Sequence, residues 1–391
     1  MVTRELFLAP RQSVIYANTL VDLFGIPNGA GALAIEATSA GANADLRVTS
    51  RTFTSGDGGT YGQSVPDIRS EDLETTLYLT GIQSNAAFRT NVGLVNRGGA
   101  DAAATLTLYD NDGNTVSTAN VTIPANNFQQ SSLQSFFPEV NGRSFDALSM
   151  RVTTPAQDVV TAFASVIDNV SQDPVYIQAK PGRGGSSMTL PAVGRANGAN
   201  GTFWRSDVTF FNPSTTRFTL SIRYANTTKT LSLGGRATFL LADVLTQMGY
   251  SSGTGPLTIS WSGPTAPVVT SRTYTTDGHG GTYGQSIDPI EELHSEVFVP
   301  GLRVDGSYRS NIGIFNGGSE TEEVTIALLS PAGYELSSSK VVLQPGELVQ
   351  QGMPAAGSFT LSVRGDADAK IFAYGSMIDN ASGDPVFFAG R

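Results

Sequence analysis

The chain has 391 residues, with 34 acidic against 24 basic side chains, a formal net charge of −10 and no cysteine. The acidic balance, without a Lys/Arg cluster to reverse it locally, argues against nucleic acid as a partner. Absence of cysteine excludes disulfides, thiolate chemistry and Cys-ligated zinc. No apolar run approaches the roughly eighteen residues of a spanning helix, so we expect no membrane insertion.

Residues 1–66 align with the second half of a later segment. LFLAPR at 6–11 matches LSLGGR at 231–236, and VDLFG at 21–25 matches LTQMG at 245–249. We therefore expect a partial β-sandwich module, with its second half only and a short helix near Thr19–Phe24. Either the chain is a fragment of a longer polypeptide, or the missing strands come from elsewhere in an assembly. An unpaired sheet edge would favour self-assembly through this incomplete module.

A glycine-rich string follows and recurs. RTFTSGDGGTYGQS at 51–64 returns as RTYTTDGHGGTYGQS at 272–286. A phosphate cradle would need a Lys and a following helix, and neither string has them. Both strings therefore predict twisted β-hairpins.

Longer repeats divide the rest of the chain. FRTNVGLVNRGG at 88–99 returns at 308–319, and SVIDNVSQDPVYIQA at 165–179 returns at 376–390. The spacing of the copies is nearly constant, at about 210 to 220 residues, which indicates an internal repeat. A shorter copy, WRSDVTFFNPST at 204–215, shows that the large unit holds two related modules. The predicted modules cover 67–181, 182–288 and 289–391.

Strand patterning in these modules predicts an all-β fold. Phe218, Leu220 and Ile222 alternate with polar residues, and similar period-two runs lie at 324–328 and 359–363. Turn sequences recur every eight to twelve residues or so, as a sandwich of short strands requires. We expect tandem Ig-like or fibronectin-like antiparallel β-sandwich modules, with short crossover helices near Ser131–Phe136 and Asp243–Met248.

Recurring polar residues have structural explanations. An Asn that closes a strand before a turn can bond the turning backbone, and an Arg that follows an aromatic can stack on the ring and bridge to a carboxylate. The residues are Asn96, Asn212 and Asn316, then Arg89, Arg205 and Arg309, with Asp168 and Asp379 as expected Arg partners.

Candidates for catalysis are few. The two histidines, His279 and His294, lie in a hairpin tip and in a linker, without a His partner at ligand spacing. No GxSxG elbow occurs, and YDNDGN at 109–114 lacks the later acidic residue of a calcium loop, which favours a hairpin there. The sequence predicts a non-enzymatic chain.

Acidic linkers are the candidate metal sites. Carboxylates at a module junction can hold Ca²⁺ and stiffen an array, or can simply be solvated. The candidate calcium ligands are Asp67, Glu71 and Asp72 at the first junction and Asp288, Glu291 and Glu292 at the second, and Glu74 and Glu296 lie nearby. No other cofactor is expected. Trp261, at a strand end, is the candidate for stacking on a sugar ring, whereas Trp204 occupies a core position of the repeat.

Two segments carry a family resemblance. Phe88 to Val92, followed by Asn96, and the run from Ser165 to Asp173-Pro174-Val175 resemble a repeat found near the ends of large secreted bacterial proteins. The resemblance implies an Ig-like sandwich that accompanies other surface modules, with no catalytic residues to carry over. We therefore expect a non-enzymatic extracellular or cell-surface array that acts as spacer, adhesin stalk or assembly module, with a protein or glycan surface ligand. One alternative is a carbohydrate-binding accessory region of a secreted polysaccharide-acting enzyme, and another is an enzyme with an unrecognised carboxylate pair.

Overall fold

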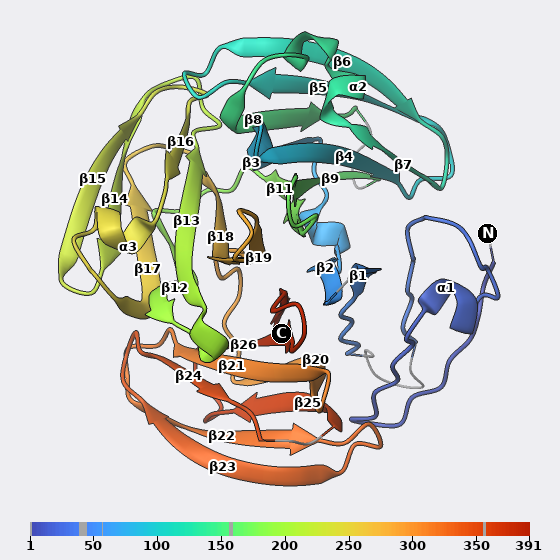
Figure 1. Cartoon of the computed structure of the whole chain (residues 1–391), viewed down its shortest axis with the longest axis vertical. Coiled ribbons are helices and arrows are strands. Elements are labelled where there is room, and N and C mark those ends of the chain that lie inside the picture. Colours follow the sequence, from blue (N-terminus) through green and yellow to red (C-terminus); the bar gives the residue numbers. More distant parts are fainter. Residues whose placement is uncertain (1, 39–44, 57, 156–158, 355–356) are drawn as a thin grey trace. The chain divides into compact units, whose positions relative to one another are not determined.

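A computed structural model describes residues 2–38, 45–56, 58–155, 159–354 and 357–391. The chain is all-β with several antiparallel sheets, as expected. It forms two compact units. The smaller unit comprises Met1–Ser50, Glu292–Asn380 and Phe388–Arg391, and the larger unit comprises Arg51–Glu291 and Ala381–Phe387. Figure 1 labels the strands along the chain.

The first part of the larger unit holds two sheets around one core. One sheet has the order β11-β3-β8-β5-β6 and the other β10-β9-β4-β7. Leu79, Leu106 and Leu148 from the first sheet pack with Val92 and Ala162 from the second. The strands are β3 (Thr76–Ser84), β4 (Phe88–Asn96), β5 (Ala102–Tyr109), β6 (Thr115–Ile123), β7 (Asn127–Ser132), β8 (Phe145–Thr153), β9 (Val160–Asp168), β10 (Pro174–Gln178) and β11 (Lys180–Pro181).

The second part of the larger unit is one sheet of order β15-β14-β17-β12-β13-β18-β19, with β16 paired to β13. Phe218, Leu220 and Ile222 on β14 are buried in its core, which confirms the predicted alternation. The elements are β12 (Ser187–Asn197), β13 (Phe203–Phe211), β14 (Phe218–Tyr224), β15 (Thr227–Leu233), β16 (Thr238–Leu241), β17 (Gly253–Trp261), β18 (Val268–Thr276) and β19 (Thr282–Ile287).

Three short helices lie where the sequence predicts them. They are α1 (Thr19–Asp22), α2 (Leu133–Phe136) and α3 (Val244–Gln247). Asn18 caps α1 through its side chain, and Ser132 caps α2 in the same way. In the described part of the chain, no helix is long and apolar enough to cross a membrane.

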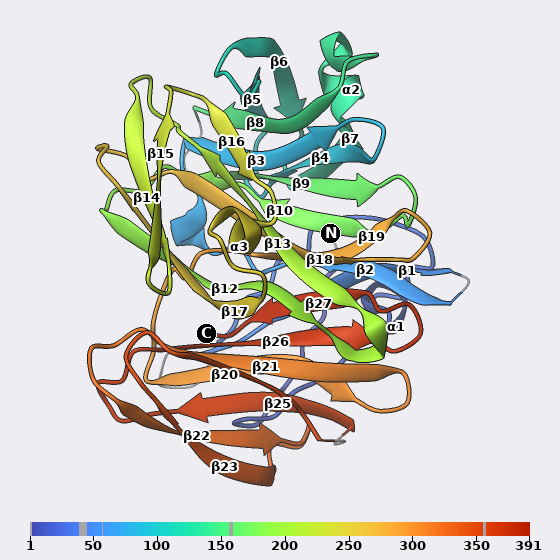
Figure 2. The same cartoon turned by 60° about the vertical axis from the view of Figure 1, so that its left-hand side comes forward.

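Both glycine-rich strings form the predicted hairpins. The first consists of β1 (Arg51–Gly56) and β2 (Gly59–Ser64), and the second of β18 and β19. Strands β2 and β19, one from each hairpin, both contact β10. Figure 2 shows β10 beside β9, the strand with which it pairs. A turn of 3₁₀ helix, η1 (Ser70–Asp72), separates the first hairpin from β3.

The two parts of the larger unit share a buried interface. Tyr109 and the rings of Phe211 and Tyr78 cluster around Val268. Beside them the Ser149 hydroxyl bonds that of Thr238 at 2.7 Å. An interface of this kind, apolar with its buried hydroxyls bonded, holds neighbouring modules rigidly.

The other two sheets have the order β20-β25-β22-β23 and β24-β21-β26-β27, and they belong to the smaller unit except for residues 385–387 of β27, which belong to the larger unit. On β25 the predicted wet face is also buried, with Thr360 7% and Ser362 8% exposed. Alternation in the sequence indicates which side chains of a strand are polar. Small hydroxyl side chains can nevertheless be buried where the second face of the strand is covered as well. The strands are β20 (Glu296–Val304), β21 (Tyr308–Asn316), β22 (Glu322–Leu329), β23 (Glu335–Leu343), β24 (Leu348–Gly352), β25 (Gly357–Arg364), β26 (Ile371–Asp379) and β27 (Pro385–Ala389).

Residues 2–38 and 45–50 contain α1 and, within those described ranges, no strand. The second half of a β-sandwich expected for 1–66 is therefore limited to the hairpin β1–β2. Strands need neighbours to pair with, and the described residues before β1 provide no counterparts of β12 to β14. Phe7 is 91% exposed in consequence.

Candidate functional site

The recurring asparagines hold the turns that follow their strands. Asn96 accepts the Gly98 amide through Oδ1 at 2.8 Å, and its Nδ2 donates to the carbonyls of Ala100 and Ile123 at 2.8 and 3.0 Å. Asn212 and Asn316 make the equivalent bonds, and all three are at most 1% exposed. The predicted Asx role is confirmed, so these residues are part of the fold.

Two of the recurring arginines, Arg89 and Arg309, donate hydrogen bonds to amide side chains, and the charge of the expected partner Asp379 acts on Arg309. Arg89 donates to Asn169 Oδ1 at 3.0 Å and to Gln172 Oε1 at 2.8 Å. Arg309 donates to Asn380 Oδ1 at 3.0 Å. The predicted bridge to Asp168 is wrong for Arg89, because the Asp168 carboxylate is engaged by backbone amides and by a hairpin.

Asp168 fixes the loop after β9 to the second hairpin. Its Oδ1 accepts the amides of Val170 and Ser171 at 2.8 and 3.0 Å. Its Oδ2 accepts the amide and the hydroxyl of Thr282 at 3.0 and 2.7 Å. Ser171 completes the joint by donating its hydroxyl to the Thr282 carbonyl at 2.7 Å. These hydrogen bonds hold together a loop and a hairpin that are separated by more than a hundred residues in the chain.

The same motif recurs at the first hairpin. Ser382 donates to the Thr60 carbonyl at 2.8 Å, as Ser171 does to Thr282. Asp384 Oδ2 accepts the Gly62 amide at 2.8 Å and Arg51 Nη2 at 3.0 Å. In the second hairpin Asp173 Oδ2 accepts the equivalent amide of Gly284 at 2.8 Å.

Glycine is required where each carboxylate meets its hairpin. A Cβ on Gly62 would lie 2.6 Å from the Thr52 carbonyl oxygen and 2.7 Å from Phe53 Cβ. A Cβ on Gly284 would lie 2.9 Å from Arg272 Nε. The GTYGQS glycines therefore serve close approach, not a phosphate.

Asp173 and Asp384, which are equivalent in the repeat, are both 0% exposed, and each carboxyl acts on the pKa of the other. Burial, followed by the charge of Asp384, raises the pKa of Asp173 well above its usual range. Burial raises the pKa of Asp384 to about 7, against the opposing effects of Asp173 and Arg51. Oδ1 of each carboxyl has no donor from elsewhere in the described residues. One proton held between the two carboxyls satisfies both oxygens.

This pair has the chemistry of an acid–base dyad but lies apart from the molecule's described cavity. That cavity, of about 210 Å³, lies between the two parts of the larger unit and does not include either carboxyl in its lining. The lining residues are Gly81, Gln83, Phe88, Val166, Val175, Ile177, Asp207, Thr209, Leu240, Thr270, Ser271, Arg272, Tyr274, Thr282 and Ser286.

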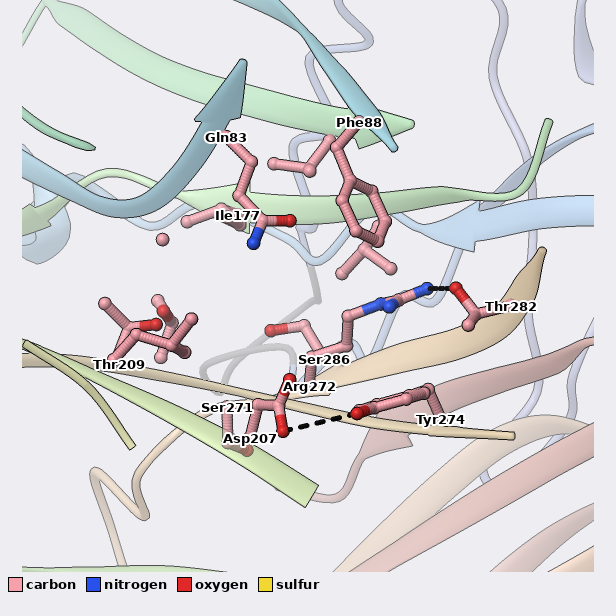
Figure 3. A pocket seen from close by; sticks show the side chains of 15 residues that line it. Gln83, Phe88, Ile177, Asp207, Thr209, Ser271, Arg272, Tyr274, Thr282 and Ser286 are labelled. Carbon is pink, nitrogen blue, oxygen red and sulfur yellow. Dashed lines mark hydrogen bonds between the residues drawn. The ribbon is translucent and has the colours of Figure 1, made fainter. Parts of the chain in front are cut away.

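Polar groups around the cavity are mostly bonded to protein partners (Figure 3). Arg272 donates to Thr282 Oγ1 at 2.7 Å, and its guanidinium lies over the rings of Phe88 and Tyr274. The Asp207 carboxylate accepts the Asp243 amide at 2.7 Å and the Tyr274 hydroxyl at 3.5 Å. Burial raises the pKa of Asp207. Two polar atoms of the lining residues, Arg272 Nε and Ser286 Oγ, are buried without a hydrogen-bond partner in the described part of the chain.

The predicted calcium ligands lie among basic side chains. Asp72 pairs with Arg183 at 3.1 Å, and Lys180 pairs with Asp288 at 3.4 Å and Glu291 at 2.8 Å. Among the described residues, no three acidic or His side chains converge as a metal site. Of the others, Asp67 lies 3.6 Å from Arg69, Glu292 lies 3.4 Å from His294, and the Glu71 side chain lies outside the described residues.

Trp261 is 9% exposed and packs in the core beside β14. The exposed indole expected at this strand end is not found, because Trp261 pairs in register with Leu220 at the inner face of the sheet. Trp204 is half-buried, and its Nε1 donates to Thr202 Oγ1 at 3.1 Å.

Sequence reasoning did not single out Asp173, Asp384, Arg51 or Arg272. The signal was present in the repeated Asp-Pro-Val and in the repeated Arg and Gly of the hairpins. A sequence repeat does not show that the equivalent residues of its two copies lie next to each other in the folded chain.

Three comparisons with known proteins were informative only in part. No family model matches it, and no curated protein matches it. Among solved structures it is similar to dimeric latent PorU from Porphyromonas gingivalis, with a TM-score of 0.15 and 11% identity. The match covers 85% of this chain and 35% of that one, so the chain spans about a third of its length. A likeness this low carries no argument about fold or function.

Proposed function

We propose that this chain is a non-enzymatic structural or adhesive array of Ig-like β-sandwich modules, a segment of a larger extracellular or cell-surface protein. The observation that carries the proposal is the repeated joint: in both copies, a loop carboxylate and a serine bind a glycine-rich hairpin through the same backbone groups. Residues that recur in the sequence are used to hold segments together.

The sheet arrangement supports sandwich modules. In residues 76–181 two antiparallel sheets contribute to one apolar core, which is the layering of a β-sandwich. The interface around Tyr109, Phe211 and Val268 supports rigidity, because neighbouring modules that share buried side chains cannot rotate freely.

The distribution of reactive groups supports a non-enzymatic role. An acid–base site needs a polar pair in contact with a substrate cleft. Asp173 and Asp384 are 0% exposed, and neither carboxyl lines the cavity. The carbohydrate-binding alternative relied on Trp261 to stack on a sugar ring, but the Trp261 indole lies in the core.

Single-molecule pulling of the whole chain tests the structural role. A rigid array predicts that residues 76–287 unfold in one cooperative event, and that Asp168→Ala splits this event or lowers its force. Asp112→Ala, at an exposed turn position outside the joint, is the matched control and should leave the trace unchanged. Two separate events in the unaltered chain would contradict the proposal, as would turnover of any glycan or peptide by the purified chain.

A further inference from the structure

We infer that Asp173 and Asp384 form a proton-dependent latch, which holds the two hairpins on their loops while the pair keeps a shared proton and weakens them when that proton is lost.

Geometry carries this inference. Each carboxyl is 0% exposed and uses one oxygen, Oδ2, to accept a hairpin amide at 2.8 Å. The other oxygen of each, Oδ1, has no external donor in the described chain. Two ionised carboxylates in contact would leave both of these oxygens without a partner and would repel each other in a medium of low dielectric constant. Protonation of one carboxyl turns the contact into a hydrogen bond.

Two arginines act on the pair, but burial outweighs their charge in raising the pKa of both carboxyls. Arg51 lies 3.0 Å from Asp384. The positive charge of Arg272 interacts with Asp173, and it interacts with the carboxylates of Asp168 and Asp207 as well. The titratable and charged groups around the pair are Arg51 and Tyr61 from the first hairpin, Arg272, Asp277 and Tyr283 from the second, and Asp168 from the loop before Asp173.

The sign of the pH effect follows from the raised pKa values. Burial raises the pKa of both carboxyls above the ordinary value near 3.8, to about 7 for Asp384. The folded joint therefore binds protons that the unfolded chain releases. Its stabilisation is complete below the ordinary pKa of the carboxyls and is lost as the pH rises through about 7. The latch is tight in acid and loosens toward alkaline pH.

Asparagine mimics the protonated carboxyl. In Asp384→Asn the side-chain oxygen can still accept from Gly62 and Arg51, while Nδ2 donates to Asp173. In Asp173→Asn the side-chain oxygen can likewise still accept the Gly284 amide, while Nδ2 donates to Asp384. Asp168→Asn is the matched control, because both oxygens of Asp168 already have N–H or O–H donors and the substitution gives no mimic of a shared proton.

The test measures melting temperature of the whole chain at about pH 5 and about pH 8, on either side of the expected transition. If the latch exists, the melting temperature of the unaltered protein should fall from about pH 5 to about pH 8 by at least about 3 °C more than that of either Asn variant of the pair. The Asp168→Asn control should lose as much as the unaltered protein. Equal losses in unaltered protein and pair variants would overturn the inference.

Infrared spectroscopy gives a second readout that needs no variant of the pair, and it is recorded on Asp207→Asn because burial also raises the pKa of Asp207. Ordinary carboxyls, with a pKa near 4, are ionised at about pH 6. A protonated-carboxyl C=O band that persists there and fades as the pH rises further is the result expected of the latch. Absence of that band at about pH 6 would overturn it.

Discussion

The rings of Tyr61 and Tyr283, at equivalent positions of the two glycine-rich hairpins, stack on each other with centroids 5.6 Å apart and planes inclined by 27°. Asp173 and Asp384, equivalent in their loops, meet in the same way. The contact is therefore self-complementary, like a two-fold interface between identical subunits, but it is formed within one chain. Substitutions at equivalent positions should have coupled effects.

Coupling between the two tyrosines can be measured with Tyr61→Ala, Tyr283→Ala and the double variant. Stacked aromatic pairs contribute about 0.5–1.5 kcal/mol beyond the area they bury, so the double variant should lose less free energy of unfolding than the sum of the singles by about this amount. Urea unfolding at fixed pH gives the three values. Strict additivity would show that the stacking contributes nothing to the joint.

Asn212→Ala should lower the free energy of unfolding by about 2–4 kcal/mol, because it removes the donor to three buried or half-buried carbonyls and the acceptor for the Ser214 amide. Asn120→Ala, on the exposed face of β6, is the control and should change it by less than about 0.5 kcal/mol. Denaturant midpoints compare the two. An equal, small effect would mean that the turn does not depend on Asn212.

Gly62→Ala should destabilise the chain by about 2–4 kcal/mol, since the new methyl group overlaps backbone 2.6 Å away and pushes the Gly62 amide from Asp384. Gly99→Ala is the matched control, because its Cβ meets nothing within 4 Å. That variant should be neutral or slightly stabilising. Thermal unfolding of both variants checks the prediction, and a neutral Gly62→Ala would contradict the close approach.

Calcium should leave the melting temperature unchanged. The linker carboxylates of Asp72, Asp288 and Glu291 are paired with Arg183 and Lys180, so a cation would have to displace a basic side chain. Calorimetric titration with Ca²⁺, repeated in the presence of a chelator, is the measurement. Heat of binding together with a rise in melting temperature would restore calcium as a ligand of the junctions.

How much of this the sequence could predict depends on the range of the interaction. Local features followed from local patterns: the Asn96 turn, the β18–β19 hairpin and the α3 helix each depend on a few consecutive residues. The Arg89 partner was mistaken because Asp168 and Asn169 are neighbours, and only the geometry of the loop decides which one faces the guanidinium. Trp261 was misplaced for a similar reason, since a strand end can lie at the inner or the outer face.

The joint itself was beyond sequence reasoning. The repeat shows that Asp173 and Asp384 are equivalent, as are Gly284 and Gly62, but it does not show that each hairpin binds a loop more than a hundred residues away. Nor does it show that the two carboxyls share one buried site. Periodicity fixes which face of a strand is buried, whereas these contacts depend on tertiary placement.

Hydrogen exchange at the amides of Thr282 and Gly284 tests the central claim most directly, because these groups bind only Asp168 and Asp173 if the hairpin is held as described. The account predicts protection comparable to that of core strands such as β9, and a large loss of protection at both amides in Asp168→Ala while β9 stays protected. Exchange in the unaltered protein as fast as at the exposed hairpin tip around His279 would contradict it.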